Sequence, residues 1–312
     1  MPIVVAEYLG VRTDSGSQFP TPVSSELKPS TPCPFRNAPC AKTSKGLTPV
    51  CSIRDDSSRQ VWIVCEHRLC ATQPRDAALN DYQEQVLGEI ANLVFPGVSK
   101  YEIAIRREAR VRRAPGKNRP DDSKADYLMV QIDLVSGKQH KASRGVILEM
   151  QGGGETSNTQ LLTKQVRKWE SSGRKSDLLT PVPIKDIATN AWRRQQEQFL
   201  FKGNVAQRSN GRLVFLMGEI LFDKVMGNIS NKPSAIPVNG GWTLALIGVS
   251  EGVGKGSFST ADSISLQLDP SRTLITDYGA FARALTDQGQ YDPELFHGEF
   301  ISLKGDEYKL GN

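Results

Sequence analysis

The sequence predicts a mixed α/β (α+β) protein in which helices flank a mixed sheet, and three observations predict it. A stretch with the helix period ends at Pro96-Gly97, three segments rich in β-branched and aliphatic residues follow, and a short, almost wholly apolar run covers residues 242–249. Of the 312 residues, 38% are hydrophobic, which is enough to build a sizeable core and excludes wholesale disorder.

The first expected element is a helix over residues 76–94, where apolar side chains recur at three- and four-residue steps. The elements expected after it are strands over 102–111, 126–134 and 145–151, helical stretches over 155–170 and 184–225, and a buried strand over 242–249. This order of a helix, a meander, further helices and a late strand is typical of a mixed sheet.

The N-terminal residues 1–75 are expected to form a small, loop-rich, separately stabilised unit, with a second domain over 76–312. Residues 13–34 are rich in Ser, Thr, Pro and Gly, which discourages regular structure before a cluster of cysteines. The clustered residues are Cys33, Cys40, Cys51 and Cys65. Their spacing matches no common zinc finger, so a metal site and ordinary buried thiols both remain open, and His67 or Cys70 could replace one of the four ligands.

The charge and the termini favour an intracellular, cytoplasmic protein without a membrane partner. Lys and Arg total 39 against 34 Asp and Glu, a net charge of +5. No stretch approaches 18 consecutive apolar residues, and the first residues lack the basic segment of a signal peptide.

Two carboxylates and an amide form the most informative pattern in the chain. Glu149 and Gln151 are two residues apart and therefore share one face of the strand predicted over 145–151. Asp126 begins the neighbouring predicted strand, 23 residues earlier. If the two strands pair, Asp126 and Glu149 can bind a hard cation such as Mg²⁺, with Gln151 orienting water. The alternative is a turn aspartate and a solvated strand face.

Nine basic residues lie between Lys100 and Lys124, against four acidic ones. They are Lys100, Arg106, Arg107, Arg110, Arg112, Arg113, Lys117, Arg119 and Lys124. Such a patch suits a phosphate backbone, and a solvated strand face and loop is the alternative. The patch directly precedes the candidate metal carboxylates, which favours nucleic acid as the partner.

Other kinds of site have little support. The three histidines lie near no Gly-x-Ser-x-Gly motif, which argues against a serine hydrolase. The segment Gly252-Val-Gly-Lys-Gly-Ser257 lacks the first glycine and the Ser or Thr of a phosphate-binding loop.

Two motifs together resemble one known family, the NotI-type restriction endonucleases. Its N-terminal cysteine module is similar to Thr31-Pro-Cys33-Pro-Phe35, Cys40, Val50-Cys51-Ser52 and Trp62-Ile-Val-Cys65-Glu-His-Arg-Leu69. Its variant of the PD-(D/E)xK nuclease motif, with Gln in place of Lys, is similar to Gly145-Val-Ile-Leu-Glu149-Met-Gln151 with Asp126 upstream. Weaker similarity continues to Leu285.

The resemblance implies a restriction-endonuclease-like mixed-sheet core and a Mg²⁺-dependent type II endonuclease. Such an enzyme cuts double-stranded DNA at a GC-rich palindrome as a homodimer in the cytoplasm of a prokaryote. Carried over by motif, the catalytic set is Asp126, Glu149 and Gln151. The resemblance also implies one structural metal, iron or zinc, on Cys33, Cys40, Cys51 and Cys65, with Cys70 outside the pattern.

Two questions stay open at the level of sequence. The first helix of this fold often adds an acidic residue to the site, and the sequence does not choose between Glu84 and Glu89. A non-catalytic, metal-stabilised DNA-binding regulator that uses the same basic region is the alternative function.

Overall fold

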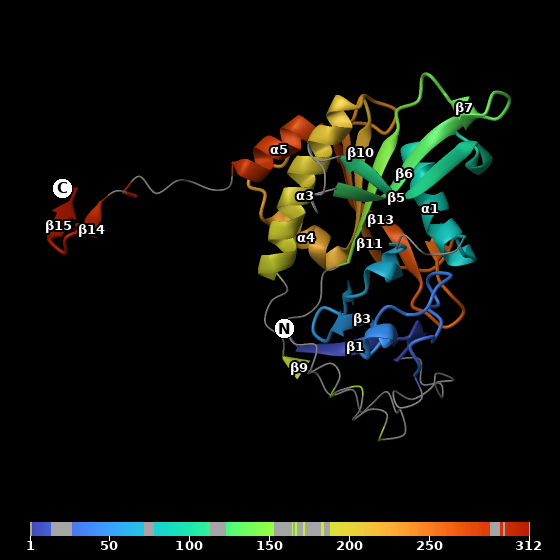
Figure 1. Cartoon of the computed structure of the whole chain (residues 1–312), viewed down its shortest axis with the longest axis horizontal. Coiled ribbons are helices and arrows are strands. Elements are labelled where there is room, and N and C mark those ends of the chain that lie inside the picture. Colours follow the sequence, from blue (N-terminus) through green and yellow to red (C-terminus); the bar gives the residue numbers. More distant parts are fainter. Residues whose placement is uncertain are drawn as a thin grey trace, which may run out of the picture.

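The computed structural model describes residues 2–13, 27–71, 78–112, 123–152, 182–183, 188–287, 294–295 and 297–311, together with Lys164, Val166 and Ser171. Its centre is an eight-stranded mixed sheet in the order β12-β13-β11-β10-β8-β6-β5, with β7 paired to β6 (Figure 1). The strands are β5 (Ile103–Arg112), β6 (Ser123–Asp133), β7 (Lys138–Gln139), β8 (Val146–Gln151), β10 (Arg212–Gly218), β11 (Leu244–Glu251), β12 (Ser257–Phe258) and β13 (Leu266–Thr276).

The three middle strands β8, β10 and β11 are parallel to one another, and antiparallel strands complete both sides of the sheet. Because both faces of these middle strands are covered, β10 is almost wholly apolar and buried along its length. The mixed α+β class that the sequence predicts is therefore confirmed at this level.

Helices cover both faces of the central sheet. On one face pack α3 (Ala188–Arg208), α4 (Glu219–Gly227) and α5 (Tyr278–Thr286), whose apolar side chains join one cluster with Phe215 of β10. On the other face packs α1 (Asp81–Val94), whose side chains join a second cluster with Val214. Alternate residues of one strand thus serve two cores, as the strand period requires.

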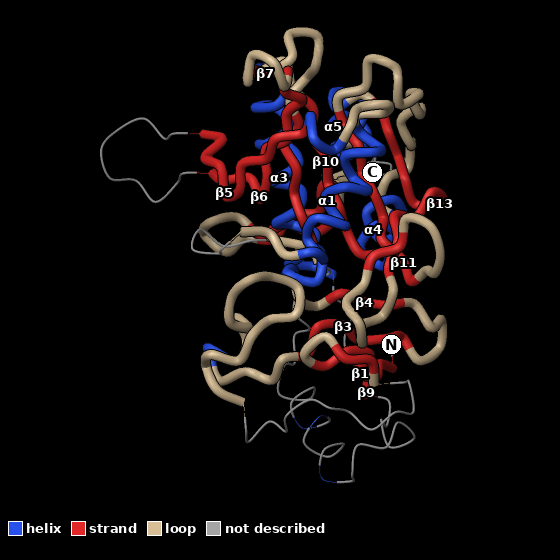
Figure 2. Tube along the Cα trace, turned by 90° about the vertical axis from the view of Figure 1, so that its right-hand side faces the viewer, coloured by secondary structure: helices blue, strands red, loops and turns tan. Residues whose placement is uncertain are grey.

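A second sheet lies beside the central one and contains β1 (Pro2–Tyr8), β2 (Val11–Arg12), β3 (Val50–Asp55), β4 (Val61–Ile63) and β9 (Val182–Pro183). Figure 2 shows it below the central sheet. Its apolar side chains, among them Ile3, Ile53 and Trp62, belong to the same cluster as α1. The described part of the N-terminal 75 residues is therefore richer in strands than its composition indicates, and it shares a core with the central sheet.

A buried ion pair links the N-terminal sheet to the rest of the chain. Glu7 on β1 accepts hydrogen bonds from Ser52 Oγ at 2.7 Å, from the Ile264 N–H at 2.7 Å and from Arg68 Nε at 2.9 Å. The Arg68 guanidinium also lies 4.6 Å from the centre of the Phe35 ring. A buried charge pair is stable only when further hydrogen bonds satisfy it, and this one is satisfied.

Most of the expected elements appear, and one expectation is wrong. The helix α1 begins at Asp81, where the Asn80 side chain caps it, and the three strands of the meander and β11 lie where the sequence predicts them. Residues 184–225 are not continuously helical, because β10 separates α3 from α4. A five-residue run such as Leu213–Met217 fits a buried strand as well as a helix. The helical pattern over 155–170 lies mainly outside the described residues.

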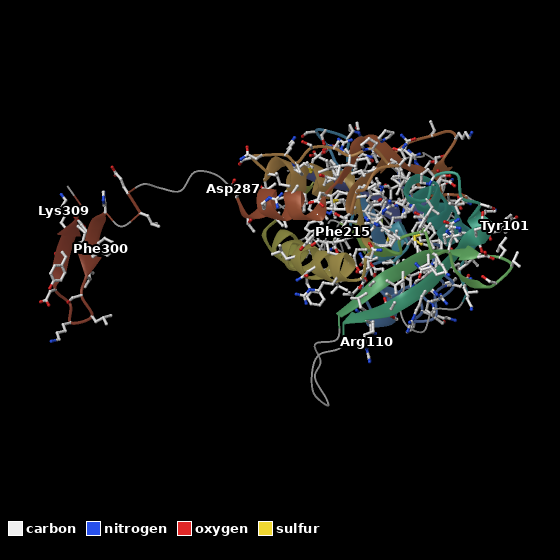
Figure 3. The ribbon with its side chains drawn as sticks, turned by 90° about the horizontal axis from the view of Figure 1, so that it is seen from above. Tyr101, Arg110, Phe215, Asp287, Phe300 and Lys309 are labelled. Atoms are coloured by element: carbon white, nitrogen blue, oxygen red, sulfur yellow. The ribbon has the colours of Figure 1, made fainter. Side chains whose placement is uncertain are left out.

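The C-terminal residues form a two-stranded hairpin of β14 (Gly298–Ile301) and β15 (Glu307–Leu310). The residues of both strands are exposed, and Figure 3 shows Phe300 and Lys309 away from the body of the protein. Two short 3₁₀ turns, η2 (Thr43–Lys45) and η3 (Glu66–Leu69), flank the N-terminal strands, and η4 (Lys100–Glu102) precedes β5.

Candidate active site

The pairing of β6 with β8 brings Asp126 and Glu149 together. The paired residues are Tyr127 with Leu148 and Leu128 with Ile147, so the next pair in this register is Asp126 with Glu149. The Asp126 carboxylate also accepts a hydrogen bond of 2.7 Å from the Met150 N–H. The two carboxylates that the sequence analysis selects therefore lie close together on neighbouring strands.

Glu149 faces the helices α3, α4 and α5. It is paired with Phe215 of β10, which belongs to the cluster on that face, and it is only 4% exposed. Gln151 follows two residues later on the same face, is paired with Met217 and is partly exposed. The site thus runs from a buried carboxylate to an amide near the surface.

Burial dominates the electrostatics of the pair. It raises the pKa of Glu149 to about 7, and the adjacent ammonium of Lys202 limits that rise. Burial of the Asp126 carboxylate, followed by repulsion from Glu149, raises the pKa of Asp126 well above its ordinary value. Two enclosed carboxylates that repel each other form a site that favours a cation.

Lys202, which the sequence analysis missed, supplies one positive charge. Its Nζ lies 2.5 Å from Glu149 Oε2, and the two side chains are 7% and 6% exposed. The sequence held one signal for it: Phe199, Lys202 and Ala206 are spaced as one face of a helix, so a lysine interrupts an apolar stripe.

Glu108 is a second residue that the sequence analysis missed. On β5, Arg107 pairs with Tyr127 and Ala109 with Ala125, which leaves Glu108 across from Asp126. Its backbone has a φ of 46°, in the left-handed region, and Lys124 lies 3.8 Å from its carboxylate. Carboxylates on β5, β6 and β8 therefore form a row across three adjacent strands.

The N-terminal part of the chain borders this row. Gly152, which follows β8, approaches the second sheet so closely that a Cβ there would lie 2.9 Å from the Ile63 carbonyl oxygen. Glu66, at the start of η3, is near enough that its charge adds to the rise in the pKa of Asp126. The glycine is needed because only a residue without a side chain fits this contact.

One direct observation indicates that the carboxylates of Asp126 and Glu149 suit a divalent cation. Glu149 Oε1 is buried and has no hydrogen-bond partner, whereas its other oxygen contacts Lys202. An unpaired buried carboxylate oxygen costs free energy, and a hard cation such as Mg²⁺ binds oxygen ligands of this kind. Asp126 and Glu149 are the residues that would hold it.

The described basic residues lie along the edge of the sheet next to this row. Arg106 and Arg110 on β5 and Lys124 on β6 are exposed. Figure 3 shows Arg110 where β5 leaves the body, at the end opposite Tyr101. Glu108 lies on β5 as well, and its charge adds to the rise in the pKa of Glu149. Arg113, Lys117 and Arg119 lie outside the described residues.

Four of the five cysteines influence one another electrostatically. Burial raises the pKa of Cys33 to about 12, and charges on Cys65 and Cys40 would raise it further. Burial likewise raises the pKa of Cys51 well above its ordinary value, with contributions from Cys65 and Cys33. A tetrahedral thiolate site takes zinc or iron, and these thiols fit it as a donor set.

As they stand, no three His, Cys, Asp or Glu side chains among the described residues are arranged as a closed metal-binding group. Cys70 lies apart from the other thiols, buried with its sulfur 3.4 Å from the Tyr127 hydroxyl. His67 is also buried, with Nδ1 2.7 Å from the Ala71 carbonyl oxygen.

The two candidate glutamates of α1, Glu84 and Glu89, lie on its more exposed side. The buried side of α1 joins the core on the sheet face opposite Glu149. Glu84 is exposed, and a Cβ on Gly256 would lie 3.1 Å from the Glu89 carboxylate, which places Glu89 beside the turn before β12. The third carboxylate of the row comes from Glu108.

Among the described residues, no helix combines the length and the apolar character needed to cross a membrane. Comparison with protein families finds no matching family model, and a search of curated proteins finds no match to this chain either.

Proposed function

We propose that this protein is a type II restriction endonuclease of the NotI type that hydrolyses double-stranded DNA with Mg²⁺ at a specific, GC-rich palindromic site. One observation carries the proposal: Asp126 and Glu149 meet on neighbouring strands, and a buried Glu149 oxygen is left without a partner. The resemblance of the two sequence motifs supports the same function.

Each residue of the site has a chemical task in this proposal. Asp126 and Glu149 hold the divalent cation, which, when bound, lowers the pKa of a water molecule and offsets charge on the phosphate. Gln151 has no basic group and therefore orients water or a ligand by hydrogen bonding. Arg106, Arg110 and Lys124 hold the DNA backbone by charge.

Cys33, Cys40, Cys51 and Cys65 have a structural task in the same proposal. Four thiolates leave no open position on a tetrahedral iron or zinc, so this metal takes no part in hydrolysis. Cys33, Cys40, Cys51 and Cys65 would hold this metal and so tie together residues 33–65, and η3, which follows them, borders the carboxylate row through Glu66. The module of residues 1–75 would thus support the nuclease core.

The first experiment is a digest. We expect the protein, incubated with long DNA of high sequence complexity and Mg²⁺, to give discrete fragments whose sequenced ends share one palindrome. The ends should carry a 5′-phosphate and a 3′-hydroxyl. A mobility shift without fragments, at any Mg²⁺ concentration, would instead favour the non-catalytic DNA-binding regulator.

Variants of the two carboxylates make the test specific. Asp126→Asn and Glu149→Gln should reduce cleavage by at least about 10³-fold, because each removes a ligand charge of the metal. Both should still bind the same DNA in Ca²⁺. Asp133→Asn is the matched control, because Asp133 is an exposed carboxylate on the same strand as Asp126. Wild-type cleavage by either site variant would refute the assignment.

The proposal includes a homodimer, because a palindrome presents two equivalent bonds to two sites related by a two-fold axis. Light scattering of the complex with a duplex that contains the cleavage site should give two chains per duplex. One chain per duplex, with both strands cut, would contradict the dimer.

A further inference from the structure

A buried lysine at an acidic site needs an explanation. Lys202 is 5% exposed, and its ammonium contacts the carboxylate of Glu149. Moving an ammonium group out of water costs several kcal/mol, and a single ion pair rarely returns more than that. A leucine or methionine of similar length would fill the same space in α3 without the cost of burying a charge, but it would leave the buried Glu149 carboxylate without its ammonium partner.

The packing of α3 fixes the position of this ammonium. Phe199, three residues before Lys202, has its ring centre 4.2 Å from that of Phe215 and 5.3 Å from that of Phe281. Phe215 is in turn the residue paired with Glu149 on the neighbouring strand. The helix is thus anchored one turn from Lys202 on the strand beside Glu149, so the contact does not depend on a flexible loop.

Lys202 satisfies only one of the two oxygens of Glu149. Glu108, Asp126 and Glu149 lie side by side across three strands, and Glu149 Oε1 remains buried without a partner even though Oε2 contacts Lys202. One ammonium therefore covers one oxygen of a group that has room for a second positive charge. A divalent cation and Lys202 would compete for the same carboxylate.

We propose that Lys202 is a positioning residue that acts as a built-in counter-cation: it holds the carboxylates in place before the divalent cation binds, and it yields Glu149 to that cation. This inference rests on the metal site of the proposed function. The lysine thereby weakens metal binding by the free protein and keeps an otherwise repulsive site folded. Because β8 has Gln rather than Lys at position 151, Lys202 also supplies an ammonium group that β8 lacks.

The test measures binding of Ca²⁺ to the free protein by calorimetry. Ca²⁺ is the probe because it prefers oxygen ligands and binds thiolates weakly, so the cysteines contribute little. Lys202→Met should bind Ca²⁺ about tenfold more tightly or better, since a positive charge leaves the site. Arg208→Met removes the same charge from an exposed position of the same helix and should leave the affinity unchanged.

Thermal unfolding supplies a second measurement. Without divalent cation, Lys202→Met should melt at a lower temperature than the wild type, and saturating Ca²⁺ should restore most of the difference. Lys202→Arg should behave like the wild type in both measurements. A purely structural lysine would lower the melting temperature equally with and without Ca²⁺, and that result would overturn the inference.

Further outcomes separate this inference from the proposed function. Unchanged or weaker Ca²⁺ binding by Lys202→Met, while Glu149→Gln abolishes it, would refute the role of Lys202 alone. Ca²⁺ binding that survives Glu149→Gln would refute the metal site and with it the proposed function. If Lys202→Met and Lys202→Gln both fail to fold even with Ca²⁺, the counter-cation role is wrong.

Discussion

At Glu149, the two oxygens of one carboxylate have different surroundings. Oε2 contacts a buried ammonium, whereas Oε1 has no partner. Two carboxylates of the row come from β5 and β6, and the positive charge comes from a helix. A site of this kind depends on single side chains, because every group in it offsets or increases the charge of another.

A variant of Glu108 tests whether the carboxylate on β5 contributes to the site formed by Asp126 and Glu149. Glu108→Gln should raise the Mg²⁺ concentration for half-maximal cleavage by about 10- to 100-fold, because it removes a charge beside the residues proposed to hold the cation. Glu102→Gln, which changes a carboxylate at the start of the same segment, is the control. Cleavage rates measured over a range of Mg²⁺ concentrations give the answer, and an unchanged half-maximal concentration would limit the row to Asp126 and Glu149.

The sequence reveals only part of this site. Asp126 and Glu149 can be selected because each lies at a defined place on a predicted strand, and alternation puts Gln151 on the face of Glu149. Glu108 depends on the register of β5 against β6, which alternation alone does not give. Lys202 depends on how α3 packs, and no local pattern encodes the strand that a helix covers.

Among the elements, β10 is the strand that the periodicity of the sequence does not reveal. Leu213–Met217 is apolar at every position because both sheet faces are covered, so neither the helix period nor the strand period is visible. Of the expected meander, β5 and β6 lie toward the edge, and buried and less buried residues alternate along β6, whereas β8 is buried over all but its last residue. The central element of a covered sheet therefore gives the weaker signal.

Gly203 is predicted to control the contact between α3 and α5. A Cβ there would lie 1.9 Å from the Tyr278 ring, so Gly203→Ala should lower the free energy of unfolding by roughly 1–3 kcal/mol and displace Lys202. Gly227→Ala in α4 is the control, because open space surrounds that glycine, and it should be neutral or slightly stabilising. Denaturant unfolding measures both, and a neutral Gly203→Ala would contradict this packing.

A pH-dependent contribution is predicted for Asp269 on β13. Burial alone would raise its pKa, but hydrogen bonds from Ser271 and Arg272 outweigh burial and lower the pKa to about 2. A carboxyl group whose pKa is lowered by folding stabilises the folded state at pH values above its pKa in the unfolded chain. This stabilisation is lost as the pH falls toward the pKa of the folded state. Asp269→Asn should therefore cost about 2 kcal/mol at pH 7 and about half of that at pH 3. Urea unfolding at the two pH values tests this, and an equal loss at both would refute it.

On the scale of the whole molecule, the two sheets share one apolar cluster. Side chains of β1, β3 and β4 pack with those of α1 and of β11, and Glu7 joins them by hydrogen bonds to Arg68 and Ile264. We expect a core that is continuous in this way to unfold as one unit. Damage to the N-terminal part should consequently spread to the central sheet.

Cys40→Ser tests this coupling together with the proposed structural metal. We expect the wild type to hold about one iron or zinc per chain, and Cys40→Ser to lose it and to unfold in a single transition at a lower temperature. Cys70→Ala, a buried thiol outside the set, should keep the metal. Elemental analysis and calorimetry measure these effects. A Cys40→Ser protein with full metal content would show that Cys40 is an ordinary buried thiol.

The hydrogen bond from the Ile264 N–H to Glu7 joins residues 257 positions apart in the chain. During synthesis, Glu7 leaves the ribosome long before Ile264 exists, and the strand β13 that closes the central sheet is also still missing. The N-terminal strands therefore stay unpacked until nearly the whole chain has been made. During that time their apolar faces and their backbone N–H and C=O groups are exposed to solvent. We expect nascent chains released before residue 264 to aggregate or to bind chaperones.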